Sequence, residues 1–202
     1  MQQLETTIST DLWIKASWEE YLEAIKNFPE NQGKSYYYNG YYRLEMTPIG
    51  NDHASDHAIL IFAVSLYATL KNLAFSAKDN CSFRRSGYRE VQPDISYYFA
   101  EKANLIPYGT SIIDLNQYPP PDLVIEISKS TLNDDLGNKR LLYEELGVSE
   151  YWSVKVEYPQ IFAFEIKVLP NLKIAVLESA LQQARTGDQS QVGRWLISQF
   201  QG

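Results

Sequence analysis

Two carboxylates stand inside segments whose composition predicts burial. Glu126 lies within Leu123–Ile127, which is apolar on both faces, as in a central strand covered on both sides. Asp94 follows Pro93 and opens a second apolar segment, Ile95–Phe99. A buried carboxylate is unfavourable unless it is paired or binds a metal ion. Two such carboxylates on neighbouring strands would form a hard oxygen site suited to Mg²⁺ or Mn²⁺.

A lysine occupies the apolar face of the helix predicted after Glu126. Four residues spaced i, i+3, i+7 and i+10 share that face: Leu136, Lys139, Tyr143 and Leu146. A lysine there either extends its amine to the surface or binds an anion, which would be Glu126, a hydroxide or a phosphate. The alternative is an i,i+4 surface pair of Asp135 with Lys139, which contributes on the order of a few tenths of a kcal/mol.

These residues carry a resemblance to known families. Gln92-Pro93-Asp94 followed by Glu126-Ile127-Ser128 resembles the PD…(D/E)XK nuclease pattern, with Ser128 where that pattern usually has lysine. A more specific resemblance, to the putative restriction endonuclease family once catalogued as a domain of unknown function, lies in the 31 residues from Asp122 to Trp152. Its motifs are the run 120–128, Ser130-Thr131, Asp135-x-x-x-Lys139, Tyr143 and the run 147–152. The whole resemblance extends from about Tyr37 to about Phe164.

The resemblance implies an α/β fold with a restriction-endonuclease-like core, a mixed sheet with flanking helices and an N-terminal β-hairpin. It implies a Mg²⁺-dependent (or Mn²⁺-dependent) DNA endonuclease in which Asp94 and Glu126 hold the metal and the lysine function has moved to Lys139. Lys129 also follows Glu126, but a regular strand would point it to the opposite face. The metal would activate water, and Lys139 would orient the hydroxide or stabilise the transition state.

Three further side chains are candidates for the same site. Glu45 ends the first predicted hairpin, before the helix that this fold often uses to supply another carboxylate; the alternative is a solvated strand position. His53 and His57 are spaced i,i+4, which can bind zinc, but the run His-Ala-Ser-Asp-His lacks the glutamate of zinc proteases. His57 is therefore assigned to phosphate contact, and the alternative is that both histidines are ordinary polar residues of a helix start.

Three arginines cluster around a predicted strand turn at Ser86-Gly87: Arg84, Arg85 and Arg89. Such a cluster predicts contacts to a nucleic-acid backbone, and the alternative is a solvated turn.

Periodicity and turn chemistry indicate the elements that position these residues. Ser17 is predicted to cap a helix ending near Asn27, and Asn39-Gly40 predicts a two-residue β-hairpin turn. Asn133 or Thr131 is predicted to cap the helix that carries Lys139. Helices are predicted over 52–73, 133–146, 173–184 and 188–200, and strands over 74–84, 89–99, 123–127, 150–156 and 160–167. The C-terminal helices, about 173–200, would cover a sheet edge or contact a second subunit.

Length and composition bound the class of protein. The 202 residues are expected to form one domain, 1–202. The net charge of −7 counts against a protein that coats nucleic acid non-specifically, but it is compatible with a carboxylate metal site. Cys81 is the single cysteine, which predicts a reducing compartment and hence the cytoplasm. No signal peptide and no apolar run of about 20 residues is visible, so no membrane association is expected.

Two readings of function compete. The first is the DNA endonuclease, expected to be a homodimer because cutting two antiparallel strands suits twofold symmetry. The second is a binding or scaffolding protein that keeps the nuclease fold without efficient catalysis, favoured by Ser128 and by the acidic charge. A further protein partner would be compatible with either reading. A zinc hydrolase using His53 and His57 lacks a third ligand.

Overall fold

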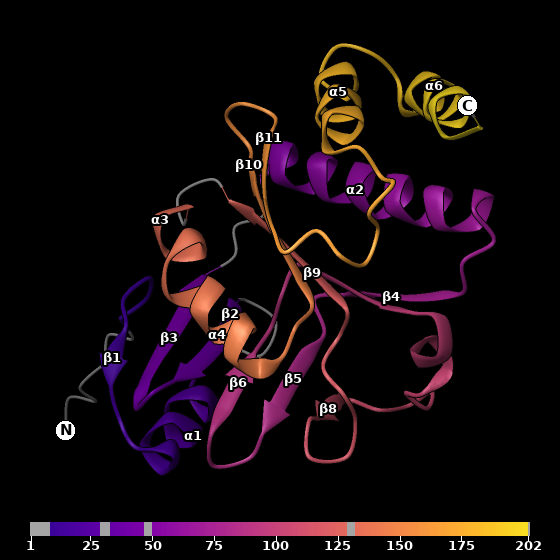
Figure 1. Cartoon of the computed structure of the whole chain (residues 1–202). Helices are drawn as coiled ribbons and strands as arrows, with labels where there is room; N and C mark the ends of the chain where they lie inside the picture. The colour runs from indigo at the N-terminus through magenta and orange to yellow at the C-terminus, as the bar shows by residue number, and fades with distance from the viewer. Residues whose placement is uncertain (1–8, 29–32, 47–49, 129–131, 202) are drawn as a thin grey trace.

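The computed structural model describes residues 9–28, 33–46, 50–128 and 132–201, and within these ranges the chain forms two mixed β-sheets flanked by helices (Figure 1). The smaller sheet has the strand order β11 (Gln160–Phe164), β10 (Glu150–Lys155), β9 (Leu123–Ser128), β7 (Ile95–Phe99), β4 (Phe75–Asp79). The larger has the order β1 (Ile14–Lys15), β3 (Tyr41–Met46), β2 (Gly33–Tyr38), β6 (Arg89–Val91), β5 (Ser82–Arg85), β8 (Ile112–Asp114). The predicted mixed α/β architecture is therefore confirmed.

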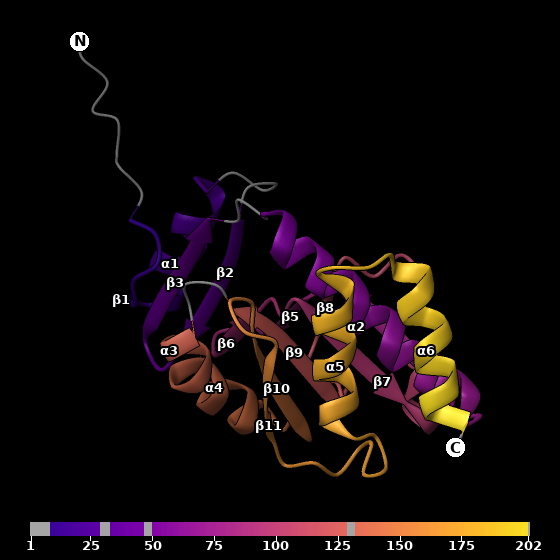
Figure 2. The same cartoon turned by 90° about the horizontal axis from the view of Figure 1, so that it is seen from above.

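Most helices lie on the two faces of the smaller sheet, and the first packs against β2 of the larger sheet. They are α1 (Trp18–Lys26), α2 (Asn51–Leu70), α3 (Leu132–Leu136), α4 (Asn138–Leu146), α5 (Ile174–Ala184) and α6 (Gln189–Gln201), with a 3-10 helix, η1 (Ala100–Asn104). Helix α2 packs on one face, and α5 and α6 pack on α2 (Figure 2). On the other face, α4 and the larger sheet enclose a second apolar cluster. The C-terminal helices thus cover α2, and α5 also contacts β11, the edge strand of the smaller sheet, which agrees with the predicted covering of a sheet edge.

Strand β9 lies at the centre of the smaller sheet, between antiparallel β7 and parallel β10. All six of its residues are buried, as predicted from a segment that is apolar on both faces. Its register places Glu126 opposite Ser153 of β10, and Ile125 opposite Ile95 of β7. Glu126 therefore lies beside Asp94, the residue that directly precedes β7.

Several local predictions are confirmed by backbone geometry. Ser17 and Glu20 form a capping box at the start of α1. Asn39 and Gly40 both have positive φ, 49° and 76°, as the predicted hairpin turn requires. Gly147 ends α4 with φ of 87°. These signals are local, which is why the sequence sufficed to place them.

The predicted strands 74–84 and 89–99 are wrong as continuous strands. Each divides in two, and the halves belong to different sheets: β4 and β7 to the smaller, β5 and β6 to the larger. Asn80, with φ of 49°, breaks the first strand, and Pro93 lies in the gap that divides the second. The second break is what places Asp94 where the chain crosses from one sheet to the other.

The predicted helix 133–146 also needs correction, and the connection 100–121 between β7 and β9 has elements of its own. Gly137, with φ of −105° and ψ of −106°, separates α3 from α4. Asn133 lies inside α3 rather than at its cap, and Thr131 is outside the described residues. The connection contains η1 and β8. Across the part of the chain that the structure describes, none of the helices combines the length and the apolar character needed to cross a membrane.

Candidate active site

Asp94 and Glu126 lie side by side where the two sheets meet, both almost fully buried. The Ile127 amide donates to Asp94 Oδ2 over 2.7 Å, and the Asp94 amide donates to Glu126 Oε2 over 3.3 Å. Each carboxylate therefore accepts from the backbone of the other's segment. These two hydrogen bonds hold the Asp94 and Glu126 side chains next to each other.

A cation that the sequence interpretation missed lies between these carboxylates. Lys34, at the start of β2, places its Nζ 2.5 Å from Asp94 Oδ1 and 3.8 Å from Glu126 Oε2. Its side chain is only 7% exposed. Within β2, alternation puts Lys34 on the same face as Tyr36, which the sequence could have indicated. What no local pattern predicts is that this face of the larger sheet meets Asp94 and Glu126.

Lys139 is buried, as its place on the apolar face of the helix predicted, but its direct partners differ from those expected. Its Nζ lies 2.9 Å from Glu45 Oε1 and 2.9 Å from Asp135 Oδ1, and 4.4 Å from the centre of the Tyr36 ring. The pair with Asp135 was the alternative interpretation, yet it is a buried pair and not a surface one, because both side chains are at most 2% exposed.

Two tyrosine hydroxyls donate to Glu126, and Lys139 lies over the ring of one of these tyrosines, Tyr36. Tyr143 donates to Glu126 Oε1 over 2.6 Å, and Tyr36 donates to the same oxygen over 3.3 Å. Among the described residues Lys139 makes no direct ion pair with Glu126, so its effect on that carboxylate is electrostatic. The tyrosines occupy Oε1 and leave Oε2 to face Lys34.

Glu45 is also a buried member of the cluster. It pairs with Lys139 and with Arg43, whose Nε lies 2.7 Å from Glu45 Oε1 and 3.4 Å from Asp134 Oδ2. The cluster thus joins three cationic side chains to six carboxyl groups: Lys34, Arg43 and Lys139 with Asp11, Glu45, Asp94, Glu126, Asp134 and Asp135. When all are ionised, it carries an excess of three negative charges.

The pKa values of the two central carboxyls are displaced in opposite directions. Burial raises the pKa of Glu126 to about 8, although Lys139 and Lys34 oppose that rise. Burial acts in the same sense on Asp94, but Lys34 and His53 outweigh it and hold the pKa of Asp94 well below its usual range. Glu126 is therefore the member of the pair that lacks sufficient positive charge around it.

Both histidines of α2 contact Asp94 or its surroundings. His53 Nε2 lies 3.6 Å from Asp94 Oδ1, and its buried Nδ1 has no hydrogen-bond partner among the described residues. His57 Nε2 lies 3.0 Å from the Asp94 carbonyl oxygen and 3.4 Å from Asp79 Oδ1. Within the described ranges, no group of three or more His, Cys, Asp and Glu side chains is arranged to hold a metal ion, so the zinc interpretation gains no third ligand.

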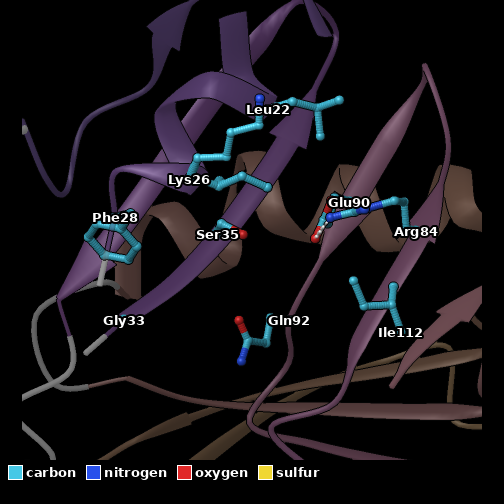
Figure 3. Close-up of a pocket in the computed structure, with 10 residues that line it drawn as sticks. Leu22, Lys26, Phe28, Gly33, Ser35, Arg84, Glu90, Gln92 and Ile112 are labelled. Carbon is cyan, nitrogen blue, oxygen red and sulfur yellow. Dashed lines mark hydrogen bonds and ion pairs between the residues drawn. The ribbon is translucent and has the colours of Figure 1, made fainter. Parts of the chain in front are cut away.

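Of the three arginines predicted to contact a nucleic-acid backbone, Arg84 and Arg89 form ion pairs within the protein and Arg85 is partly exposed. Arg84 donates twice to Glu90, over 2.6 and 3.0 Å, and lines a cavity of about 410 Å³ between α1 and the larger sheet (Figure 3). Arg89 is buried, pairs with Glu145 and stacks on Tyr88. Arg85 is partly exposed. Two of the three arginines are thus already paired, and DNA contact by all three stays a prediction.

The position that usually holds lysine has a structural hydrogen-bond network instead. The Ser128 hydroxyl lies in a short hydrogen bond with Asp135 and 3.2 Å from Ser153 Oγ. It contacts α3 and β10 rather than Asp94. Lys129, Ser130 and Thr131 lie outside the described residues.

Comparison with known proteins bears on the family and the fold of the chain. The fold is similar to that in a crystal structure of a putative nuclease of the DUF820 group from Anabaena variabilis, with a TM-score of 0.55 and 18% identity, over 82% of this chain and 98% of that one. A family model described as putative restriction endonuclease, Uma2, matches residues 18–196. The chain belongs to that family. No curated protein is similar enough to count as a relative.

Proposed function

We propose that the chain is a divalent-metal-dependent endonuclease that hydrolyses phosphodiester bonds in DNA. The observation that carries this proposal is the pair of buried carboxylates, Asp94 and Glu126, contacting one cation at the junction of the two sheets. The family and the structural neighbour support nuclease chemistry, while metal and substrate are inferred from the site.

The residues present fit a divalent metal ion. The Lys34 ammonium marks a position where a cation contacts Asp94 Oδ1 and Glu126 Oε2, and carboxylate oxygens are the ligands that Mg²⁺ and Mn²⁺ prefer. When bound, the metal would lower the pKa of a water molecule and offset charge on the phosphate.

The remaining residues of the cluster act by position and charge. Tyr143 and Tyr36 hold Glu126 through Oε1, so that Oε2 keeps its direction toward the cation position. Lys139, fixed by Glu45 and Asp135, is a buried positive charge that opposes the rise in the pKa of Glu126 and so favours the ionised form that would bind a metal. Glu45 in turn orients Lys139. Such fixed charges accelerate a reaction because they need no rearrangement when the reaction occurs.

The substrate and partners follow from the same proposal. DNA is the proposed substrate, and a homodimer would place two sites on opposite strands of a duplex. A protein partner would supply sequence specificity, and the single Cys81 suits the cytoplasm.

A second candidate is a nuclease-fold binding or scaffolding protein without efficient catalysis. One observation favours it: Ser128 replaces the usual lysine and is committed to a hydrogen-bond network with Asp135. Fold alone does not decide between the two functions.

Cleavage of supercoiled plasmid with Mg²⁺ or Mn²⁺ tests the proposal. The wild-type protein should cut, and Glu126→Gln and Lys139→Ala should not, with folding verified by circular dichroism. Asp122→Asn is the matched control, since Asp122 precedes the same strand but pairs with Lys102, outside the cluster. If the wild type cuts no supercoiled, linear or single-stranded DNA with either metal, the scaffolding protein replaces the enzyme.

A further inference from the structure

Lys34 occupies the place that the proposed metal ion would need. Its Nζ lies 2.5 Å from Asp94 Oδ1 and 3.8 Å from Glu126 Oε2, an oxygen that also accepts from the Asp94 amide. An ammonium and a divalent cation cannot share these two oxygens, because both would lie within a few ångströms of each other in a buried site. Binding of a metal therefore requires Lys34 to leave.

Lys34 and Lys139 differ in how firmly each is held. Lys139 has two carboxylates at 2.9 Å and an aromatic ring against it, and none of these belongs to the central pair. Lys34 has one close carboxylate contact, at 2.5 Å, and a second at 3.8 Å. Among the described residues, its only ion-pair partners are the two carboxylates that the metal would take. Metal entry would thus release Lys34 and leave Lys139 in place.

A released lysine at this position has an anion to bind. Lysine carries a compact charge on a flexible four-carbon chain, and it is a frequent ligand of phosphate. The Lys34 backbone lies near the start of β2, where the register with β3 places it directly opposite Glu45. From that anchor, its ammonium remains next to the carboxylates when it moves, and hence next to the phosphate that a bound metal would hold.

We propose that Lys34 is the catalytic lysine of this protein: it holds the cation position between Asp94 and Glu126 in the metal-free state and turns to the substrate phosphate when a divalent cation enters. This inference rests on the proposed nuclease function. It assigns to β2 the role that the sequence interpretation gave to Lys139, and it explains how Ser128 can occupy the usual lysine position.

Mn²⁺ binding without DNA tests the displacement. Lys34→Met keeps the length of the side chain and removes the competing charge, so its affinity for Mn²⁺, measured by calorimetry, should rise at least about tenfold. Lys34→Arg keeps a positive charge and should not show that gain. Lys102→Met is the matched control, because Lys102 makes a similar pair with Asp122 at 2.6 Å outside the cluster, and its affinity should equal that of the wild type.

Cleavage at saturating Mn²⁺ tests the catalytic role. Lys34→Met should lose about a hundredfold or more in rate, as expected when a group that stabilises transition-state charge is removed. Tighter Mn²⁺ binding together with slower cleavage is a combination that general damage to the fold does not produce. Because the variant leaves two carboxylates facing each other, its melting temperature in EDTA should fall and should rise with Mn²⁺ by more than that of the wild type.

The outcomes separate this inference from the proposed function. Unchanged or weaker Mn²⁺ affinity in Lys34→Met would overturn the displacement, and tighter affinity with an unchanged cleavage rate would overturn the catalytic role. If the wild type cuts no DNA, the proposed function and the catalytic role both fail. A gain in Mn²⁺ affinity in Lys34→Met would in that case still support the displacement.

Discussion

Replacing Lys139 by methionine should cost far more stability than the helical spacing of its acidic partner suggests. The substitution keeps the side-chain length but leaves Glu45 and Asp135 without their shared cation in a buried environment. Breaking a buried ion pair costs about 3–5 kcal/mol, whereas an exposed i,i+4 pair contributes roughly 0.3–0.5 kcal/mol. We expect a loss of about 4 kcal/mol, which for a chain of this size lowers the melting temperature by roughly 8–16 °C.

Urea denaturation in EDTA, followed by tryptophan fluorescence, measures this loss directly. Arg140→Met is the matched control, since Arg140 also makes an i,i+4 pair, with Glu144, but the Arg140 side chain is 34% exposed and that of Glu144 67% exposed. The double variant Lys139→Met/Glu45→Gln should recover part of the loss, because it removes one of the two carboxylate charges that lose Lys139 as a partner. If Lys139→Met loses no more stability than Arg140→Met, the buried charge cluster does not exist as described.

Three other predictions follow from the same region. The pKa of Glu126 is raised to about 8, whereas a glutamate in the unfolded chain releases its proton near pH 4–5. Between these two values the folded metal-free protein holds a proton that the unfolded chain lacks, so stability in EDTA should fall as the pH rises from about 4.5 to about 8. The stability of Glu126→Gln, measured by denaturation, should lack this pH dependence. Ser128→Ala should lower stability by about 1–3 kcal/mol through the loss of its bond to Asp135, yet keep the plasmid cleavage rate within a few-fold. Gly33→Ala should destabilise by at least about 1–3 kcal/mol in thermal denaturation, because a Cβ at Gly33 would lie 2.3 Å from a ring carbon of Phe28.

The sequence predicted those parts of the site that depend on local pattern. Glu126 was identifiable because a carboxylate inside a uniformly apolar strand needs a partner, and Lys139 because helical spacing places it among Tyr143 and Leu146. Both residues are buried in the structure. The hairpin at Asn39-Gly40 and the helix end at Gly147 were predictable for the same reason, since positive φ has a clear residue signature.

The parts that the sequence did not predict depend on how distant segments meet. Lys34 belongs to one sheet and its partners to the other, so no spacing along the chain connects them. The pairing of Arg84 with Glu90 also needs the register between β5 and β6, which turns a cluster of arginines into a set of ion pairs. The division of the two long predicted strands arises because the chain changes sheets at Asn80 and near Pro93, and apolar content alone does not reveal such a crossing.

Anomalous scattering from a crystal soaked in Mn²⁺ tests the central claim most directly, namely that Asp94 and Glu126 form a divalent-cation site. The account predicts a peak in contact with Asp94 Oδ1 and Glu126 Oε2, with the Lys34 ammonium displaced from both oxygens. No peak between the two carboxylates at millimolar Mn²⁺, with Lys34 still in contact with Asp94, would contradict it.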